Sequence, residues 1–189
     1  MSAMWSQPNV SCARAALLFG VCGAVSSQFM NLEGWGLYVL PVPFGVLAAW
    51  LCVGRIGPGI ALVFLDAAVW QPALRIPDWL SSNPIITRPT VLSVCLAGLV
   101  GGLGVSLATA LCQRRLPTAR AVGRCAIIGA VCGLPFLCWR PGAWWISAGG
   151  FTTPWWVWAI AVLCFAIWQA AVGVCLWHGF RLGKPDRVT

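Results

Sequence analysis

An aspartate inside a long apolar run is the residue in this sequence whose type and place most strongly suggest chemistry. Asp66 stands in the run IALVFLDAAVW, with no other charge within eight residues. An ionisable group at membrane depth is costly, which makes Asp66 a candidate solute or proton site. Its depth depends on its helix. A helix that stops at Trp70 places Asp66 near an interface, paired with an arginine, whereas a helix that continues to Ile76 with a kink at Pro72 places it near mid-membrane.

A few polar or aromatic side chains in the other apolar runs are candidates to line one cavity with Asp66. Gln28 and Glu33 lie at the outer end of the first run, Trp70 lies near the outer end of the third, and Gln169 lies inside the last. We predict that these residues form an outward-facing, ligand-binding site. The alternative for Gln28 and Glu33 is a solvated helix end, and the alternative for Asp66 is an ion pair with one outer arginine among Arg75, Arg88 and Arg140.

Motifs for catalysis and for metal binding are missing from the sequence. It contains no G-x-S-x-G, no H-E-x-x-H and no glycine-rich phosphate loop followed by lysine. The ten cysteines form no C-x-x-C pair, and one histidine with four acidic residues offers too few partners for a zinc or iron–sulfur site. His178 alone excludes a bis-histidine haem but leaves open one axial ligand to a pigment. We predict no enzyme, no metal site and no disulfide network, with the cysteines acting as small apolar residues; the cofactor stays unknown.

The composition indicates a chain whose solvent is lipid. The sequence is 60% hydrophobic and 8% charged, whereas a soluble domain carries about 25% charged residues. The net charge of +8 does not indicate nucleic-acid binding, because the basic residues lie in short segments between apolar runs and form no single patch. The lipid bilayer is therefore the expected partner, with partner membrane subunits or a homo-oligomer as further expectations.

Six apolar segments predict the fold. Roughly 20 residues cross a bilayer as a helix, and the fourth and sixth segments reach that length easily. We expect an all-α integral membrane protein, a compact bundle of about six transmembrane helices, with residues 1–189 forming a single polytopic domain and no soluble domain. The segments are 13–30, 37–54, 58–70 with an extension to 76, 90–112, 121–139 and 154–180.

The second and third segments are short or interrupted by proline and glycine. Pro41 and Pro43 predict regular helix only from Phe44, and the third segment opens with Gly57-Pro58-Gly59. Interrupted segments in membrane proteins point to a binding site, because their freed backbone groups must face protein or water. A re-entrant pair would place Arg55 inside the bilayer, so two short helices are the preferred interpretation. The proline-rich stretch 71–89 predicts an irregular loop with at most one short helix around 78–82.

The basic residues predict the orientation. With the N-terminus inside, nine Lys and Arg residues fall on the inner side and three on the outer side. This asymmetry predicts that both termini are cytoplasmic; we expect the bacterial inner (plasma) membrane. The inner residues are Arg14, Arg55, Arg114, Arg115, Arg120, Arg124, Arg181, Lys184 and Arg187, and the outer ones are Arg75, Arg88 and Arg140.

Small residues recur at four-residue spacing in the fourth segment, at Gly98, Gly102, Ser106 and Ala110. Such a stripe lets two helix backbones approach closely. Packing inside the chain and docking of another subunit are the two interpretations. Nine of the thirteen tryptophans fall at the expected outer face, either as an interfacial belt or as a surface for a lipid, pigment, flat ligand or partner.

Two functions follow as hypotheses. The first is a small-solute transport or solute-binding membrane component, with an outward-facing cavity around Asp66. The alternative is a non-catalytic accessory subunit of a larger membrane complex, docked through the fourth helix and the outer tryptophans. A pocket converging on Asp66 would favour the first hypothesis, and a solid core with a flat apolar outer face would favour the second.

Overall fold

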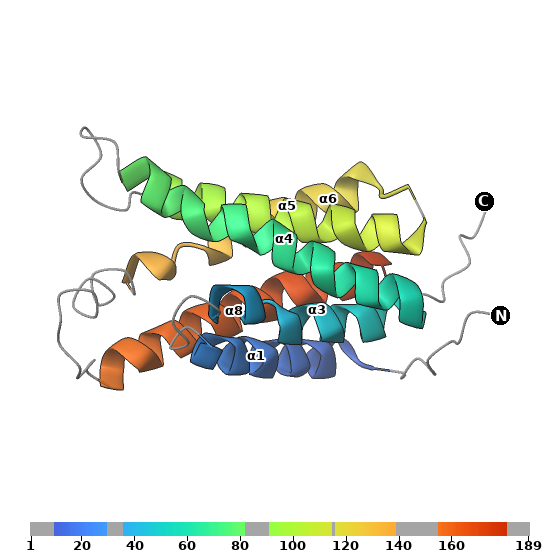
Figure 1. Cartoon of the computed structure of the whole chain (residues 1–189), viewed down its shortest axis with the longest axis horizontal. Helices are drawn as coiled ribbons and strands as arrows, with labels where there is room; N and C mark the ends of the chain where they lie inside the picture. Colours follow the sequence, from blue (N-terminus) through green and yellow to red (C-terminus); the bar gives the residue numbers. More distant parts are fainter. Residues whose placement is uncertain (1–9, 30–35, 82–90, 115, 139–154, 181–189) are drawn as a thin grey trace.

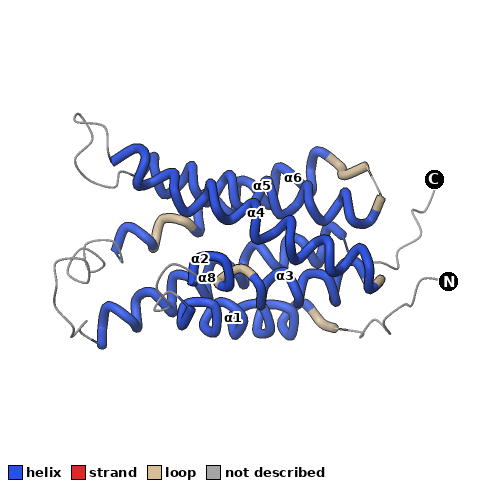
Figure 2. The backbone as a smooth tube through the Cα atoms, viewed as in Figure 1, coloured by secondary structure: helices blue, strands red, loops and turns tan. Residues whose placement is uncertain are grey.

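The computed structural model describes residues 10–29, 36–81, 91–114, 116–138 and 155–180, and these residues are mostly helical, with no strand among them (Figure 2). The elements are α1 (Cys12–Gln28), α2 (Gly36–Val39), α3 (Val42–Ala48), the π-helical turn η2 (Ala49–Val53), α4 (Ile56–Ser81), α5 (Val91–Gln113), α6 (Ala119–Cys132) and α8 (Trp155–Phe180).

The long helices lie side by side and alternate in direction, so that the start of α1 and the end of α8 lie at the same end of the bundle (Figure 1). The most extensive packing joins α1 to α8, α5 to α6 and α4 to α5. Four helices of the described residues are long and apolar enough to cross a membrane: Ile56–Ile76, Val91–Gln113, Ala119–Cys138 and Trp158–Phe180. Two apolar helices, Cys12–Gln28 and Val42–Val53, are shorter.

The outer surface of the bundle is apolar. Phe64, Leu111, Leu17 and Ile127 each expose about two thirds of their surface or more. Apolar side chains at this density on the outside suit hydrocarbon as a solvent, and a water-soluble protein rarely exposes contiguous apolar patches of this kind. The four long apolar helices and this surface fit a membrane location.

Helix α4 continues well beyond the ends considered from the sequence. It passes through Pro72 and Pro77 to Ser81, so the prediction of an irregular loop is wrong for residues 71–81, while residues 82–90 lie outside the described part. Proline removes one backbone hydrogen bond from a helix but does not force it to end. Asp66 consequently occupies the midpoint of the apolar stretch Ile56–Ile76.

The second apolar segment is divided into three short elements. Pro41 is the N-cap of α3, and the prolines fall in its first turn, where a missing backbone N–H costs little. Regular helix therefore begins at Val42, two residues earlier than predicted. The π-turn η2 ends at Gly54, whose φ of 67° lies in the left-handed region that glycine adopts without strain.

The small-residue stripe of α5 packs against α6 inside the chain. A Cβ atom added to Gly98 would overlap the backbone carbonyl of Gly129, and one added to Gly102 would overlap that of Cys125. Ser106 and Ala110 are also buried. The neighbouring glycines face the other way, Gly101 toward Trp168 and Gly104 toward Val69 of α4. Helix α5 thus lies between α6 and α4, and its stripe is covered by this chain's own backbone.

Candidate functional site

Asp66 is buried at the centre of the bundle, with no ion pair and no hydrogen bond of normal geometry among the described residues. Its side chain is 1% exposed, and neither carboxyl oxygen makes a hydrogen bond. No ion pair to an arginine is found for it in the described part of the chain; Arg75 belongs to that part, whereas Arg88 and Arg140 lie outside it. Since buried polar groups in folded proteins are almost always hydrogen-bonded, both empty oxygens require an explanation.

Gly45 of α3 faces this carboxyl group. A Cβ atom at Gly45 would lie 3.2 Å from Asp66 Oδ2 and 3.1 Å from the Val63 Cα atom. The lack of a side chain therefore lets α3 approach α4 at the level of the carboxylate. This contact places the second apolar segment, which Pro41 and Pro43 interrupt, beside Asp66. The sequence analysis had taken that interruption as a pointer to a binding site.

Trp70, four residues after Asp66 on the same helix, carries the second empty polar group. Its side chain is 5% exposed and its indole N–H has no hydrogen-bond acceptor. The N–H lies near the Asp66 carboxylate, but the geometry is not that of a hydrogen bond. One carboxylate acceptor and one indole donor thus lie together on α4, both unfilled and both shielded from solvent.

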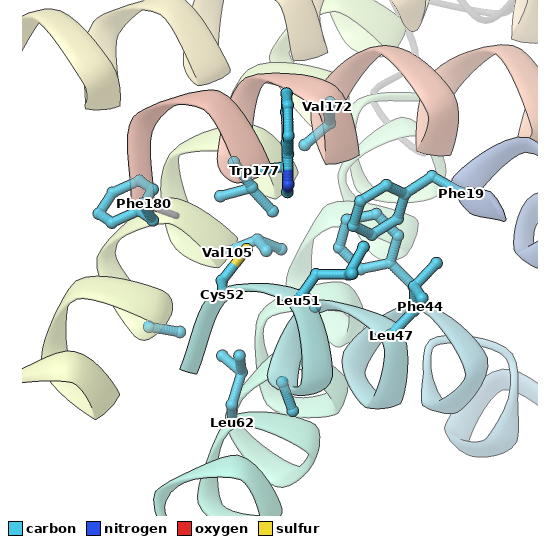
Figure 3. Close-up of a cluster of buried hydrophobic side chains, with 14 of the residues drawn as sticks. Phe19, Phe44, Leu47, Leu51, Cys52, Leu62, Val105, Val172, Trp177 and Phe180 are labelled. Carbon is cyan, nitrogen blue, oxygen red and sulfur yellow. The ribbon is translucent and has the colours of Figure 1, made fainter. Parts of the chain in front are cut away.

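Aromatic rings surround Trp70 and extend through the bundle. Trp70 stacks on Phe165 of α8, with ring centroids 6.0 Å apart, and meets Trp168 edge-on at 5.0 Å. Trp168 in turn contacts Phe44 of α3 at 6.1 Å, and Phe44 contacts Phe19 of α1 at 5.2 Å. Figure 3 shows Phe19 and Phe44 facing each other within the apolar core. Four helices thereby place their rings around one apolar interior next to Asp66.

Gln169 is fully buried but is oriented toward a different neighbour. Its amide nitrogen donates to Ser26 Oγ of α1 at 3.1 Å, while its amide oxygen accepts no hydrogen bond. The structure gives no hydrogen bond between Gln169 and Asp66. Gln169 therefore joins α8 to α1 and keeps one acceptor unfilled.

Of the remaining predicted site residues, Gln28 is exposed, and its side-chain amide makes hydrogen bonds only within its own helix. It donates to Ala24 O at 3.5 Å and to Ser27 Oγ at 3.3 Å, at the end of α1. Glu33 lies outside the described residues. The structure therefore brings Asp66 and Trp70 together and does not bring Gln28 to them.

A buried polar residue that the sequence analysis did not single out is Gln113, at the end of α5. Its side-chain nitrogen donates to Cys52 O, at 2.6 Å, and to Phe180 O. Its backbone oxygen accepts from the Arg55 guanidinium at 3.4 Å. The last carbonyls of a helix have no partner within it, and Gln113 fills two of them at once. The one available signal was a glutamine at the end of a helix without charged residues, directly before Arg114.

The described residues offer little for metal or thiol chemistry. They contain no group of three or more His, Cys, Asp or Glu side chains that could hold a metal ion. All ten cysteines are free thiols, and His178 is exposed at the end of α8. The arrangement at Asp66 therefore suits the binding of a cation or a hydrogen-bonding solute in an apolar, aromatic setting. Comparisons with protein-family models, with curated proteins and with solved structures find no match to this chain.

Proposed function

We propose that this chain is an integral membrane protein that binds a small solute inside a six-helix bundle, as a transport or solute-binding component. The observation that carries the proposal is the Asp66 carboxyl group, buried at the midpoint of α4 with both oxygens unfilled. A charged side chain in hydrocarbon costs about 2.5–3.5 kcal/mol on insertion scales. A residue that costs this much without stabilising the fold through a partner is best explained by a function.

Several other buried polar groups among the described residues support this argument, because they make hydrogen bonds within the protein. Ser106 Oγ donates to Leu103 O and Thr109 Oγ1 donates to Val105 O, both at 2.8 Å. The Trp168 indole donates to Gly129 O at 3.1 Å. These hydroxyl groups and this indole thus have partners, whereas Trp70 Nε1, Gln169 Oε1 and both carboxyl oxygens of Asp66 have none, and Asp66 alone among them carries an ionisable group.

The transmembrane arrangement in the proposal has six spans with both termini in the cytoplasm. Arg55, beside Gln113, and Arg120 and Arg124, at the start of α6, gather at the end of the bundle where α8 ends, whereas Arg75 lies toward the other end of α4. This distribution supports the positive-inside assignment. Reporter fusions after Arg120 and after Thr189 should both report a cytoplasmic location, and an external signal from either would contradict the topology.

The solute site is tested by ligand stabilisation without any assumption about the ligand's charge. The purified protein in detergent is heated with each member of a panel of organic cations, organic anions, sugars, nucleosides and neutral amides. A ligand at about 100 times its Kd stabilises the folded protein by about 2.7 kcal/mol. We expect at least one class to stabilise the wild type and not Asp66→Asn. Gln28→Ala, which changes an exposed amide, is the matched control and should respond like the wild type.

A panel in which no compound separates wild type from Asp66→Asn would remove the solute-binding proposal. The accessory-subunit alternative would then lead, and purification in a mild detergent should recover a stoichiometric membrane partner. The α5 stripe would not be the docking face in that case, since α6 covers it. The exposed Trp79 of α4 and Trp155 of α8 would be the surface to mutate.

A further inference from the structure

We infer that the ligand of the Asp66 site is a small organic ammonium ion with an apolar body. This inference rests on the proposed function and deepens it by naming the class of solute. Three properties of the site lead to it: the sign of the missing partner, the lack of further ligands for a metal, and the aromatic surroundings.

The missing partner must be positively charged or a strong hydrogen-bond donor. The two Asp66 oxygens are acceptors when the carboxyl group is ionised, and both are empty. No arginine, lysine or histidine of the described residues reaches them. A carboxylate in these surroundings therefore has no positive partner within the described part of the chain, and the ammonium group of a ligand would supply both the charge and up to three N–H donors.

A bare metal ion fits the site poorly. Hard metal cations such as Ca²⁺ and Mg²⁺ require several oxygen ligands to replace the water molecules that they lose on binding. The described residues hold no cluster of three acidic, histidine or cysteine side chains, and Gly45 and Trp70, which lie near the carboxyl group, have no oxygen in their side chains. A cation that brings its own apolar groups needs far fewer polar contacts than a metal ion does.

The aromatic interior suits the rest of such a ligand. Trp70 lies one helical turn from the carboxylate, and its ring adjoins Phe165 and Trp168. Cations are attracted to aromatic faces, most strongly to tryptophan, and the attraction grows when water is excluded. The unfilled Trp70 N–H offers one further contact, either to an acceptor on the ligand or to the carboxylate that holds it.

The inference is tested by equilibrium binding of radiolabelled benzylammonium to the full-length protein in lipid nanodiscs. Benzyl alcohol and benzoate have the same ring with a neutral and an anionic head, and they serve as competitors. We expect saturable benzylammonium binding that neither competitor displaces at equal concentration. Asp66→Asn should weaken it roughly tenfold or more. Trp70→Phe should weaken it by roughly three- to tenfold, and Trp155→Phe, the same change at an exposed site, should leave it unchanged.

The possible failures are distinguishable. If benzyl alcohol displaces benzylammonium as well as unlabelled benzylammonium does, the site selects shape and not charge, and the ammonium inference is wrong while a solute site remains. Equal binding to wild type and Asp66→Asn would also overturn it, because the probe would then occupy lipid or another surface. If none of the three compounds binds, the inference is again overturned, and the broader solute panel decides the proposed function separately. The competition with wild type requires no variant, so the test holds even if Asp66→Asn fails to fold.

Discussion

Gln113 and Asp66 are both buried polar residues on adjacent helices, and they are used in opposite ways. Gln113 joins three chain segments, because its side chain fills the carbonyls of Cys52 and Phe180 while its own backbone oxygen accepts from Arg55. Asp66 is more deeply buried and fills none of its hydrogen-bonding capacity within the protein. Gln113 supplies hydrogen bonds to two helix ends at one end of the bundle, and Asp66 leaves both carboxyl oxygens without a hydrogen bond at its centre.

The contrast shows that burial alone does not reveal the role of a polar residue; the number of hydrogen bonds that it makes within the protein does. Removing a residue that makes buried hydrogen bonds leaves its partner groups unsatisfied, which costs about 1–3 kcal/mol for each such group. Removing a residue with no partners strands nothing. Stability measurements on matched variants therefore separate the two roles.

The largest loss is expected for Gln113→Ala. The substitution strands the carbonyls of Cys52 and Phe180 in apolar surroundings, so we expect the free energy of unfolding to fall by about 2–4 kcal/mol. The measurement is unfolding by SDS titration in mixed micelles. Gln28→Ala removes the same amide from an exposed helix end and should change the free energy by less than about 0.5 kcal/mol. Equal effects of the two substitutions would show that Gln113 does not join the segments.

Asp66→Asn should move stability in the other direction or leave it unchanged. An amide has the same shape as a carboxyl group without its charge, and no arginine is stranded by the change, so we expect the free energy of unfolding to hold or to rise by about 1–2 kcal/mol. Ligand stabilisation should be lost in the same variant. A fall of more than about 1 kcal/mol would mean that Asp66 has a structural partner, and the contrast with Gln113 would collapse.

Trp70 and Trp168 allow the same comparison at a finer scale, because each is 5% exposed and only Trp168 uses its indole N–H, which it donates to Gly129 O. Phenylalanine at either position leaves a similar void. Trp168→Phe also loses a hydrogen bond, whereas Trp70→Phe removes an unpaired donor. We expect Trp168→Phe to cost about 1–2 kcal/mol more than Trp70→Phe in the same SDS titration. A reversed order would show that the Trp70 N–H is satisfied.

The smallest change is expected for Gly45→Ala. The added Cβ would lie in a tight contact with Asp66 Oδ2 and the Val63 Cα atom, and a few tenths of an ångström of adjustment should limit the loss to about 1 kcal/mol. Ligand binding should suffer more than stability, because the methyl group displaces the carboxylate. Gly57→Ala, where a Cβ meets no atom within 4 Å, is the control. Unchanged ligand binding in Gly45→Ala would place the ligand away from the α3 side of Asp66.

The lengths of the apolar runs were sufficient to locate the helical segments, because each long run of apolar residues in a membrane must satisfy its backbone as a helix. The end of the third segment could not be read in this way. Pro72 and Pro77 predict a break from local preference, but α4 continues through both prolines to Ser81. The apolar neighbours of Asp66 left its depth open between an interface and mid-membrane, because the depth depends on the end of α4, and its lack of a partner depends on where distant arginines lie.

Gln113 illustrates a part of the structure that no local pattern encodes. Its acceptors, Cys52 and Phe180, are 61 and 67 positions away in the chain. The contact of Gly45 with Asp66 is likewise invisible in the sequence, since glycine at that place has many ordinary explanations. Glu33 and several of the predicted outer tryptophans lie outside the described residues, so those predictions stay predictions.

The glycine contact between α5 and α6 has a consequence for how the protein is made. Gly98 faces the Gly129 carbonyl and Gly129 faces the Gly98 carbonyl, so the two backbones exclude side chains from each other. Helix α6 follows α5 directly in the chain, so both helices of this pair are synthesised before α8. Trp168 of α8 then donates to the Gly129 carbonyl, on the contact surface that the two helices have formed. We therefore expect α8 to pack last, against the contact surface that α5 and α6 have already formed around Gly98 and Gly129.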